Sequence, residues 1–314
     1  MASRFAQQNQ SSKSNATYSN RAASSGTIPN DTSSSHPSSS ASKVLPILIM
    51  LDVSPSMHDN GRIEEQNIAI ATLLKSLSRI DKVRKVTRVS FCLFTRGVKY
   101  TTKFMPLTEL KFPASPYLTS VCPLTCTYMQ EGQKKEYVLN LPQFTALKDD
   151  GTDIPDAVDT ALTMMQEYVR SLPASQLQHY VPFLFFTSDG NPDLSQYSTT
   201  DREDYKRRTM ETAQRMNSVC NRKSSIEDLI IPFFIGIGNA EEDYLRSFCR
   251  EFQAGVQLAR QNGEPLTNGE YLTFSNITEQ IAQAIAQSIT LRESSDKLLS
   301  RIDLIIANLQ YIYD

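Results

Sequence analysis

Short apolar segments alternate with amphipathic helical patterns along this 314-residue chain, and no other feature restricts its fold as strongly. An apolar run at Pro46–Leu51 precedes a helical pattern that extends to Ile80. In the second half, helix, strand, helix and strand are expected at about 154–170, 181–187, 201–218 and 229–237. Strands that alternate with helices form parallel sheets covered by helices. We therefore predict an α/β fold: a doubly wound, mostly parallel six-stranded sheet with helices on both faces.

Three local patterns add detail to this expectation. Residues 87–94 alternate apolar and polar side chains and are followed by a turn at Arg96-Gly97 and a second extended run, which indicates an antiparallel hairpin. In the first helix, Asn67 lies within the apolar stripe, so we expect it to have hydrogen-bond partners. For the helix that begins at Ile154, Asp153 is the expected N-cap.

Composition argues against several classes of protein. A net charge of −2 and a pI near 6.0 give no electrostatic reason to bind nucleic acid or an anionic membrane. Residues 1–10 lack the apolar core of a signal peptide, and no segment approaches the roughly 18 consecutive apolar residues of a membrane span. The five cysteines are scattered, which is typical of a reducing compartment. We therefore expect a cytoplasmic protein.

The chain divides into three predicted parts. Residues 1–43, rich in Ser and Asn, have too few apolar side chains to fold and are predicted to be a disordered tail. Residues 44–290 form the predicted domain, with an insertion at about 111–142 that is either a recognition element beside a site or a small hairpin capping a sheet edge. Residues 291–314 predict an amphipathic helix that packs on the domain or docks elsewhere. Its apolar residues have heptad spacing and are Leu298, Ile302, Ile305, Leu309 and Ile312.

Polar side chains follow predicted strands or open a helix at three places. Asp52, Ser54 and Ser56 come directly after the first apolar strand. Thr152 lies just before a predicted helix, and Asp189 follows another apolar strand. In a doubly wound sheet, the carboxyl ends of the strands converge at a topological switch point where ligands bind. We therefore predict that these five residues form one site.

Their chemistry suits a hard divalent cation, with Mg²⁺ expected first and Mn²⁺ as the alternative. Mg²⁺ prefers oxygen ligands in octahedral geometry at about 2.1 Å. Two carboxylates nearly neutralise the ion, and hydroxyl groups add ligands without adding charge. The metal then remains electrophilic enough to recruit one further carboxylate. The expected partner is therefore a protein that supplies an Asp or a Glu.

The motif Asp52-x-Ser54-x-Ser56, together with Thr152 and Asp189, resembles the metal-ion-dependent adhesion site of von Willebrand factor A domains. This resemblance implies a Rossmann-like fold in which Asp52, the two serines and Thr152 lie near the metal. It implies that Asp189 binds the metal directly or through water, and that an acidic side chain of the partner is the sixth ligand. The expected function is a metal-dependent protein–protein interaction without catalysis.

The resemblance covers about residues 45–289. Ile235-Gly-Ile-Gly238 is similar to the fifth strand of the family, and Pro106–Leu110 looks most like the bacterial tellurium-resistance-associated cytoplasmic subgroup. Membership of that subgroup would imply a bacterial stress or defence system. One position departs from the pattern, because Pro55 stands where many relatives have glycine. Proline stiffens this turn without removing a ligand.

Two other functions remain open. A Mg²⁺-dependent phosphohydrolase would use Asp52 as its nucleophile, but such enzymes have a second carboxylate two residues later, where this chain has Ser54. The sequence also has no Gly-x-Ser-x-Gly elbow and no Gly-rich phosphate loop. A metal-independent scaffold would act through the helix at 291–314. Intact ligand positions favour a binding module over both.

Overall fold

A computed structural model describes residues 43–297 with gaps at 131–132, 149–150, 174–179, 191, 193, 195–196, 221–228, 238–239, 249–255, 260–281, 286, 288 and 290–296. The predicted tail therefore lies outside the described residues except for Lys43. The apolar positions of the predicted C-terminal helix also lie outside them. All described elements belong to the unit Ser40–Asp314. No helix among the described residues is long and apolar enough to cross a membrane.

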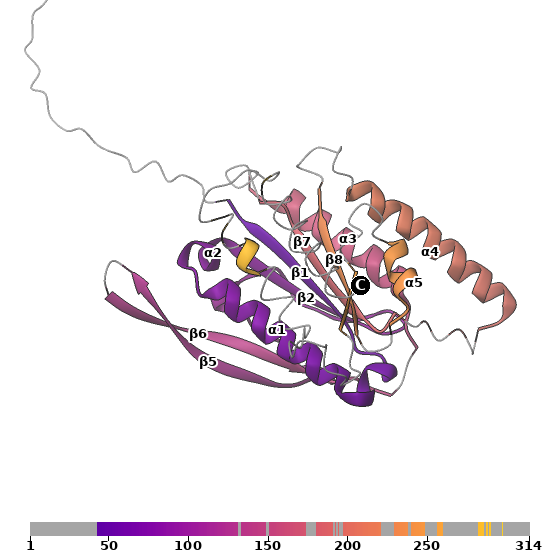
Figure 1. The fold of residues 1–314 in the computed structure, drawn as a ribbon, viewed down its shortest axis with the longest axis horizontal. Helices are drawn as coiled ribbons and strands as arrows, with labels where there is room; N and C mark the ends of the chain where they lie inside the picture. Colours follow the sequence, from indigo (N-terminus) through magenta and orange to yellow (C-terminus); the bar gives the residue numbers. More distant parts are fainter. Residues whose placement is uncertain are drawn as a thin grey trace, which may run out of the picture. The chain divides into compact units, whose positions relative to one another are not determined.

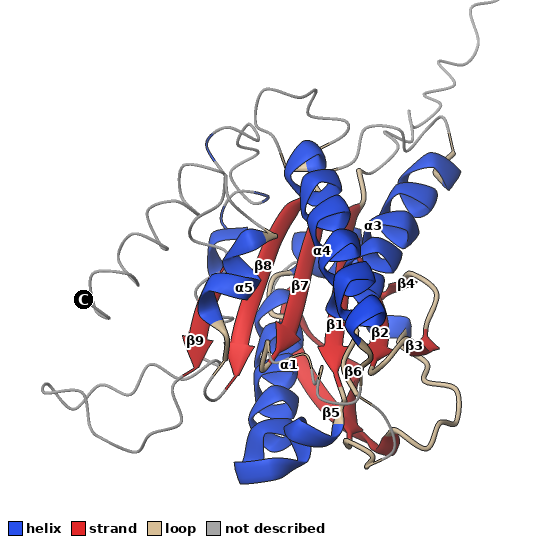
Figure 2. Cartoon of the chain, turned by 90° about the vertical axis from the view of Figure 1, so that its right-hand side faces the viewer, coloured by secondary structure: helices blue, strands red, loops and turns tan. Residues whose placement is uncertain are grey.

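The main sheet is mostly parallel, and six of its described strands follow the order β3-β2-β1-β7-β8-β9 (Figure 2). Their bounds are β1 Leu45–Asp52, β2 Thr87–Phe94, β3 Val98–Thr101, β7 Phe183–Ser188, β8 Ile231–Ile237 and β9 Val256–Ala259, and the short β4, Met105–Pro106, pairs with β2. Only β3 and β4 run antiparallel to their neighbour β2. The predicted α/β fold is confirmed, and β4 adds to the six expected strands.

Helices cover both faces of this Rossmann-like sheet, as predicted. Helix α1 lies on one face, and α3 and α4 lie on the other (Figures 1 and 2). The bounds are α1 Arg62–Ser78, α2 Asp81–Val86, α3 Ile154–Ser171, α4 Thr199–Val219 and α5 Glu242–Ser247, with 3₁₀ helices at Pro55–Gly61 and Leu107–Glu109. The chain adds β2 on one side of β1 and then β7 on the other side. The strand order therefore reverses between β1 and β7.

The position of β1 in the centre of the core explains why its sequence is a nearly continuous apolar run. All eight residues of β1 are buried, because strands flank it on both edges and helices cover both faces. Phe94, Phe186 and Phe234 form a row across the sheet, with ring centroids 5.0 and 4.9 Å apart. Burying each phenyl ring contributes about 2–3 kcal/mol to folding. At the other end of the chain, Ile285 and Ile289 also join this core.

The local patterns predicted from the sequence are confirmed. Strands β2 and β3 form the expected antiparallel hairpin. Asn67 is buried in α1, where its side chain donates to the Phe144 carbonyl and accepts from the Phe144 backbone N–H, both at 2.8 Å. Asp153 caps α3 by accepting a hydrogen bond from the Asp156 backbone N–H at 3.1 Å.

The predicted insertion forms a long hairpin, with strands β5 (Leu118–Gln130) and β6 (Gln133–Phe144). These strands pair with each other as a separate two-stranded sheet. In Figure 1 the hairpin lies beside α1, which β6 contacts. The expectation of a hairpin is therefore confirmed, but it packs along a helix instead of capping an edge of the main sheet.

Candidate metal centre

The candidate site lies where the strand order reverses. Asp52 is the last residue of β1, and Ser188 is the last residue of the neighbouring parallel strand β7. Leu51 pairs with Thr187 in the register, so the residues that follow each of them leave the sheet side by side. Asp189 then follows directly after β7. This is the switch-point position that the sequence predicted for a ligand site.

Asp52 organises the first loop through short hydrogen bonds. Its Oδ1 atom accepts from the Ser54 backbone N–H at 2.8 Å, and its Oδ2 atom accepts from the Ser188 hydroxyl at 2.6 Å. The Ser54 and Ser56 hydroxyl oxygens lie 3.1 Å apart. Adjacent ligands of an octahedral Mg²⁺ with bonds of about 2.1 Å are roughly 3.0 Å apart. The two hydroxyl groups are therefore spaced as neighbouring ligands would be.

Negative charge accumulates at this point of the molecule. The Asp52 side chain is fully buried, and this desolvation, followed by the nearby charge of Asp189, raises its pKa from 3.8 to about 7. Hydrogen bonds from Ser188 and Ser54 oppose the increase in pKa without cancelling it. A cation bound between the two carboxylates would remove the repulsion that causes part of this shift. The electrostatics of the site thus favour a positive ligand.

Asp189 contacts a residue that the sequence analysis did not single out. Arg62, the first residue of α1, donates from Nη1 to Asp189 Oδ2 at 3.1 Å and to the Ser56 carbonyl oxygen at 3.0 Å. The Arg62 guanidinium therefore bridges the first loop and the loop after β7. Arginine six residues beyond Ser56 is unremarkable in the sequence, so only the fold identifies its role.

Thr152 belongs to a third loop at the same end of the sheet. The backbone N–H of the next residue, Asp153, donates to the Thr95 carbonyl just beyond β2 at 2.9 Å, and the Val53 N–H donates to the Phe94 carbonyl at 3.0 Å. The ends of β1 and β2 thus hold this loop close to Asp52. The Thr152 side chain is 4% exposed, and within the described part of the chain it forms no hydrogen bond to the other four predicted ligands.

A salt bridge between helices fixes the third loop from outside the site. Arg208 of α4 donates to both carboxylate oxygens of Asp153, at 3.1 and 2.9 Å. Such a two-pronged pair restricts orientation as well as position. Arg208 thus connects α4 to the N-terminus of α3, beside Thr152. Sequence reasoning missed this residue, because nothing local distinguishes it from the other basic residues of α4.

Gln66 supports the site from beneath. Its Nε2 donates to the Asp52 carbonyl oxygen at 3.3 Å, and its Oε1 accepts from the Thr187 hydroxyl at 2.5 Å. This fully buried amide connects β1 and β7 from α1. A signal was present in the sequence, since Gln66 lies within the apolar face between Ile63 and Ile70.

The donor set is composed of oxygen atoms. Two carboxylates and three hydroxyl groups are the ligands that Mg²⁺ and Mn²⁺ prefer, and zinc prefers nitrogen and sulfur. No group of three or more His, Cys, Asp or Glu residues is positioned to hold a metal in the part of the chain that the structure describes. The chemistry of the five predicted ligands fits a hard cation.

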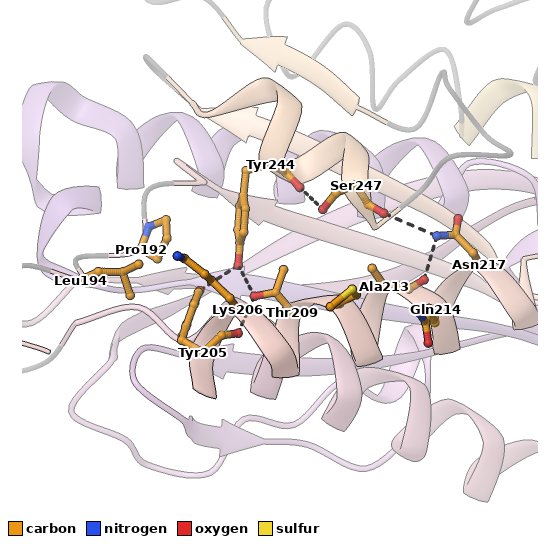
Figure 3. Close-up of a pocket in the computed structure, with 11 residues that line it drawn as sticks. Pro192, Leu194, Tyr205, Lys206, Thr209, Ala213, Gln214, Asn217, Tyr244 and Ser247 are labelled. Atoms are coloured by element: carbon orange, nitrogen blue, oxygen red, sulfur yellow. Dashed lines mark hydrogen bonds between the residues drawn. The ribbon is translucent and has the colours of Figure 1, made fainter. Parts of the chain in front are cut away.

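A second concave feature lies between α4 and α5, apart from the predicted ligands (Figure 3). This pocket has a volume of about 620 Å³. The Tyr205 and Tyr244 hydroxyl groups lie 2.8 Å apart, and Asn217 donates to the carbonyl oxygens of Ala213 and Ser247 at 2.8 and 3.4 Å. These polar groups therefore hydrogen-bond to one another or to the backbone within the pocket wall.

Comparisons with known proteins give only distant likenesses. No protein-family model matches the chain, and no curated protein matches it. Among solved structures, it is similar to proximal thread matrix protein 1 from the mussel byssus, with 11% identity, a TM-score of 0.43 and coverage of 79% of this chain and 48% of that one. The chain thus spans about half the length of the mussel protein.

Two further solved structures are of bacterial and protozoan proteins. The PilB minor pilin of Streptococcus sanguinis has 13% identity and a TM-score of 0.44, with coverage of 80% of this chain and 64% of that one. The manganese-loaded TRAP protein of Plasmodium vivax has 16% identity and a TM-score of 0.36, covering 71% and 70%. Likenesses at this level carry no information about what this chain binds.

Proposed function

We propose that this chain is a metal-dependent protein-interaction module of the von Willebrand factor A type. In this proposal, Asp52, Ser54, Ser56, Thr152 and Asp189 hold Mg²⁺ or Mn²⁺, and an Asp or Glu of the partner completes the coordination. The proposal is supported mainly by the buried position of Asp52 at the β1–β7 switch point. The Ser54 and Ser56 hydroxyl oxygens lie 3.1 Å apart, and Asp189 is near enough to raise the pKa of Asp52. The cation would supply the positive charge that attracts the partner's carboxylate.

The chain's own residues would perform distinct tasks. Gln66 holds the carboxyl ends of β1 and β7 together, and Arg208 holds the loop that carries Thr152. Rigid loops at the end of a sheet keep ligands in place before the partner arrives, which reduces the entropic cost of binding. The resemblance to the tellurium-resistance subgroup extends the proposal to a cytoplasmic protein of a bacterial stress or defence system.

The rival phosphohydrolase gains no support from the geometry. Among the described residues, the groups that hydrogen-bond to the Asp52 carboxylate are the Ser54 backbone N–H and the hydroxyl groups of Ser54 and Ser188, and none of them is a general acid for a leaving group. Action through the C-terminal helix concerns residues outside the described part of the chain and stays a prediction.

The first experiment is a calorimetric titration of chelator-stripped protein with Mg²⁺ and Mn²⁺. Wild type should bind one ion, and Asp52→Ala and Thr152→Ala should lose binding while keeping the wild-type circular dichroism spectrum, because both side chains are polar and neither belongs to the hydrophobic core cluster. Asp59→Ala is the matched control, since this exposed carboxylate is near the first loop but outside the proposed ligand set. Wild-type affinity in both ligand variants would exclude the proposed site.

The second experiment concerns the partner. Immobilised wild-type chain should retain a protein in Mg²⁺ that it releases in EDTA, and Asp52→Ala should retain none. Retention that is equal in EDTA and in the variant would favour the metal-independent scaffold.

A further inference from the structure

The Arg62 guanidinium occupies an unusual position for a cation. It is at the N-terminus of α1, where the helix dipole disfavours positive charge. Glu64 and Glu65 in the same turn carry the negative charge that the dipole favours there. Its side chain is only 15% exposed, and its Nε atom is buried without a hydrogen-bond partner. Both features disfavour this conformation. The contacts that favour it are those to Asp189 and to the Ser56 carbonyl oxygen.

Asp189 needs a counter-charge at this place. Its side chain is 4% exposed, and Asp52 lies close enough for the two carboxylates to interact electrostatically. A buried carboxylate without a nearby cation is strongly destabilising. The guanidinium therefore neutralises Asp189 at the same oxygen-rich point where the proposed function places a divalent cation.

We infer that Arg62 is a built-in counter-ion that competes with the divalent metal for Asp189, so that the metal must displace the guanidinium before the site can fill. This inference rests on the proposed function. Like charges repel strongly at the few ångströms available here, because a partly buried site screens them poorly. The side chain has a route outward, since it begins in the first turn of α1 and retains some exposure. The exchange sets a threshold concentration of free metal below which the site stays in its arginine-paired form.

Titration of the full chain with Mg²⁺ tests the competition. Arg62→Gln keeps a shorter, polar side chain and removes the charge, and it should bind Mg²⁺ roughly tenfold more tightly than wild type, as expected for removing one partly screened like charge. Arg62→Lys keeps the charge and should remain within about threefold of wild type. Arg170→Gln, an exposed arginine in the last turn of α3, is the matched control and should bind as wild type does.

A stability measurement gives a second readout. Without metal, Arg62→Gln should melt at a lower temperature than wild type, because Asp189 loses its counter-charge. On addition of Mg²⁺, the melting temperature of Arg62→Gln should increase by more than that of wild type. Arg62→Met, which is uncharged and of similar length, provides the same comparison if circular dichroism shows that the glutamine variant is misfolded.

The outcomes separate the two proposals. If wild type binds Mg²⁺ and the uncharged variants bind equally or more weakly, Arg62 pre-organises the loops and the inference of competition is overturned, while the proposed function stands. If neither wild type nor any Arg62 variant binds Mg²⁺ or Mn²⁺, both proposals fall. Binding by the uncharged variants alone would support the competition directly.

Discussion

Gly190 adopts a left-handed backbone conformation, with a φ of +67°, directly after Asp189. Its N–H donates to the Ser188 hydroxyl at 2.9 Å, and that hydroxyl donates in turn to Asp52. A Cβ atom at this position would lie 3.0 Å from Leu245 Cγ and 3.2 Å from the Glu241 backbone nitrogen. The tight turn and the close approach of α5 therefore both require glycine.

The substitution Gly190→Ala should consequently lower the free energy of unfolding by about 1–3 kcal/mol, since strain and steric overlap add. It should also weaken Mg²⁺ binding, because the loop that carries Asp189 must shift. Gly151→Ala is the control: an added Cβ there meets no atom within 4 Å. Urea denaturation and calorimetry measure the two effects. A Gly190→Ala protein as stable as wild type would contradict the packing described for this turn.

At the scale of elements, the β5–β6 hairpin is joined to the domain by an aromatic clamp. Arg84 of α2 lies in the angle between the rings of Tyr128 and Tyr137, whose centroids are 5.8 Å apart and whose planes are inclined by 61°, and its guanidinium carbon is 3.7 and 4.4 Å from the two centroids. It also donates to Asp81 at 2.5 Å, and Tyr137 donates to the Ser78 carbonyl oxygen at 2.9 Å. The clamp therefore fixes the hairpin through one residue of each of its strands.

We predict that Arg84→Lys lowers stability by about 1–2 kcal/mol, because an ammonium group stacks less well between two rings than a planar guanidinium does. Amide hydrogen exchange should accelerate in β5 and β6 more than in β1 and β7, since the hairpin is the element released. Arg170→Lys, on an exposed turn of α3, should change neither quantity. Uniform acceleration across the main sheet would show that Arg84 supports the whole domain instead.

For the whole molecule, folding has an unfavourable electrostatic contribution at the candidate metal centre. It buries Asp52 close to Asp189, which raises the Asp52 pKa from 3.8 to about 7. A carboxyl group whose pKa is higher in the folded state stabilises that state when protonated, and its contribution is fully present below pH 3.8. The contribution decreases as pH increases toward about 7, because the unfolded state then ionises and loses a proton that the folded state still holds.

In EDTA, the melting temperature of wild type should therefore fall, relative to Asp52→Asn, as pH increases from about 4 to about 7. The asparagine side chain has the same shape and stays neutral at every pH, so it removes this group from the comparison. Saturating Mg²⁺ should reduce the fall in wild type, because the metal stabilises the ionised carboxylate. Parallel melting curves for the two proteins in EDTA would contradict the raised pKa.

Features that depend on local periodicity could be predicted from the amino-acid sequence. The continuous burial of β1, the hairpin β2–β3, the cap at Asp153 and the partnered Asn67 follow from apolar spacing and from hydrogen-bonding needs that nearby residues reveal. The parallel order of strands follows from their alternation with helices. The positions of the polar loops at strand ends were likewise predictable, although their binding of metal remains a prediction.

The distant side chains that support the polar loops at the strand ends are evident only in the tertiary structure. Arg62 meets Asp189 across 127 residues, Gln66 meets Thr187 across 121, and Arg208 meets Asp153 across 55. The place of Gln66 in the apolar face of α1 predicts a buried amide, but no spacing predicts its partner or the partners of Arg62 and Arg208. A single polar contact between distant residues depends on how helices pack on the sheet and not on spacing along the chain. The same holds for the hairpin, whose Tyr128 and Tyr137 meet Arg84 of α2 only in the folded chain. Secondary structure depends on residues that are near one another in the sequence. The net charge of a site depends on side chains from distant parts of the chain, which come together only when the chain folds.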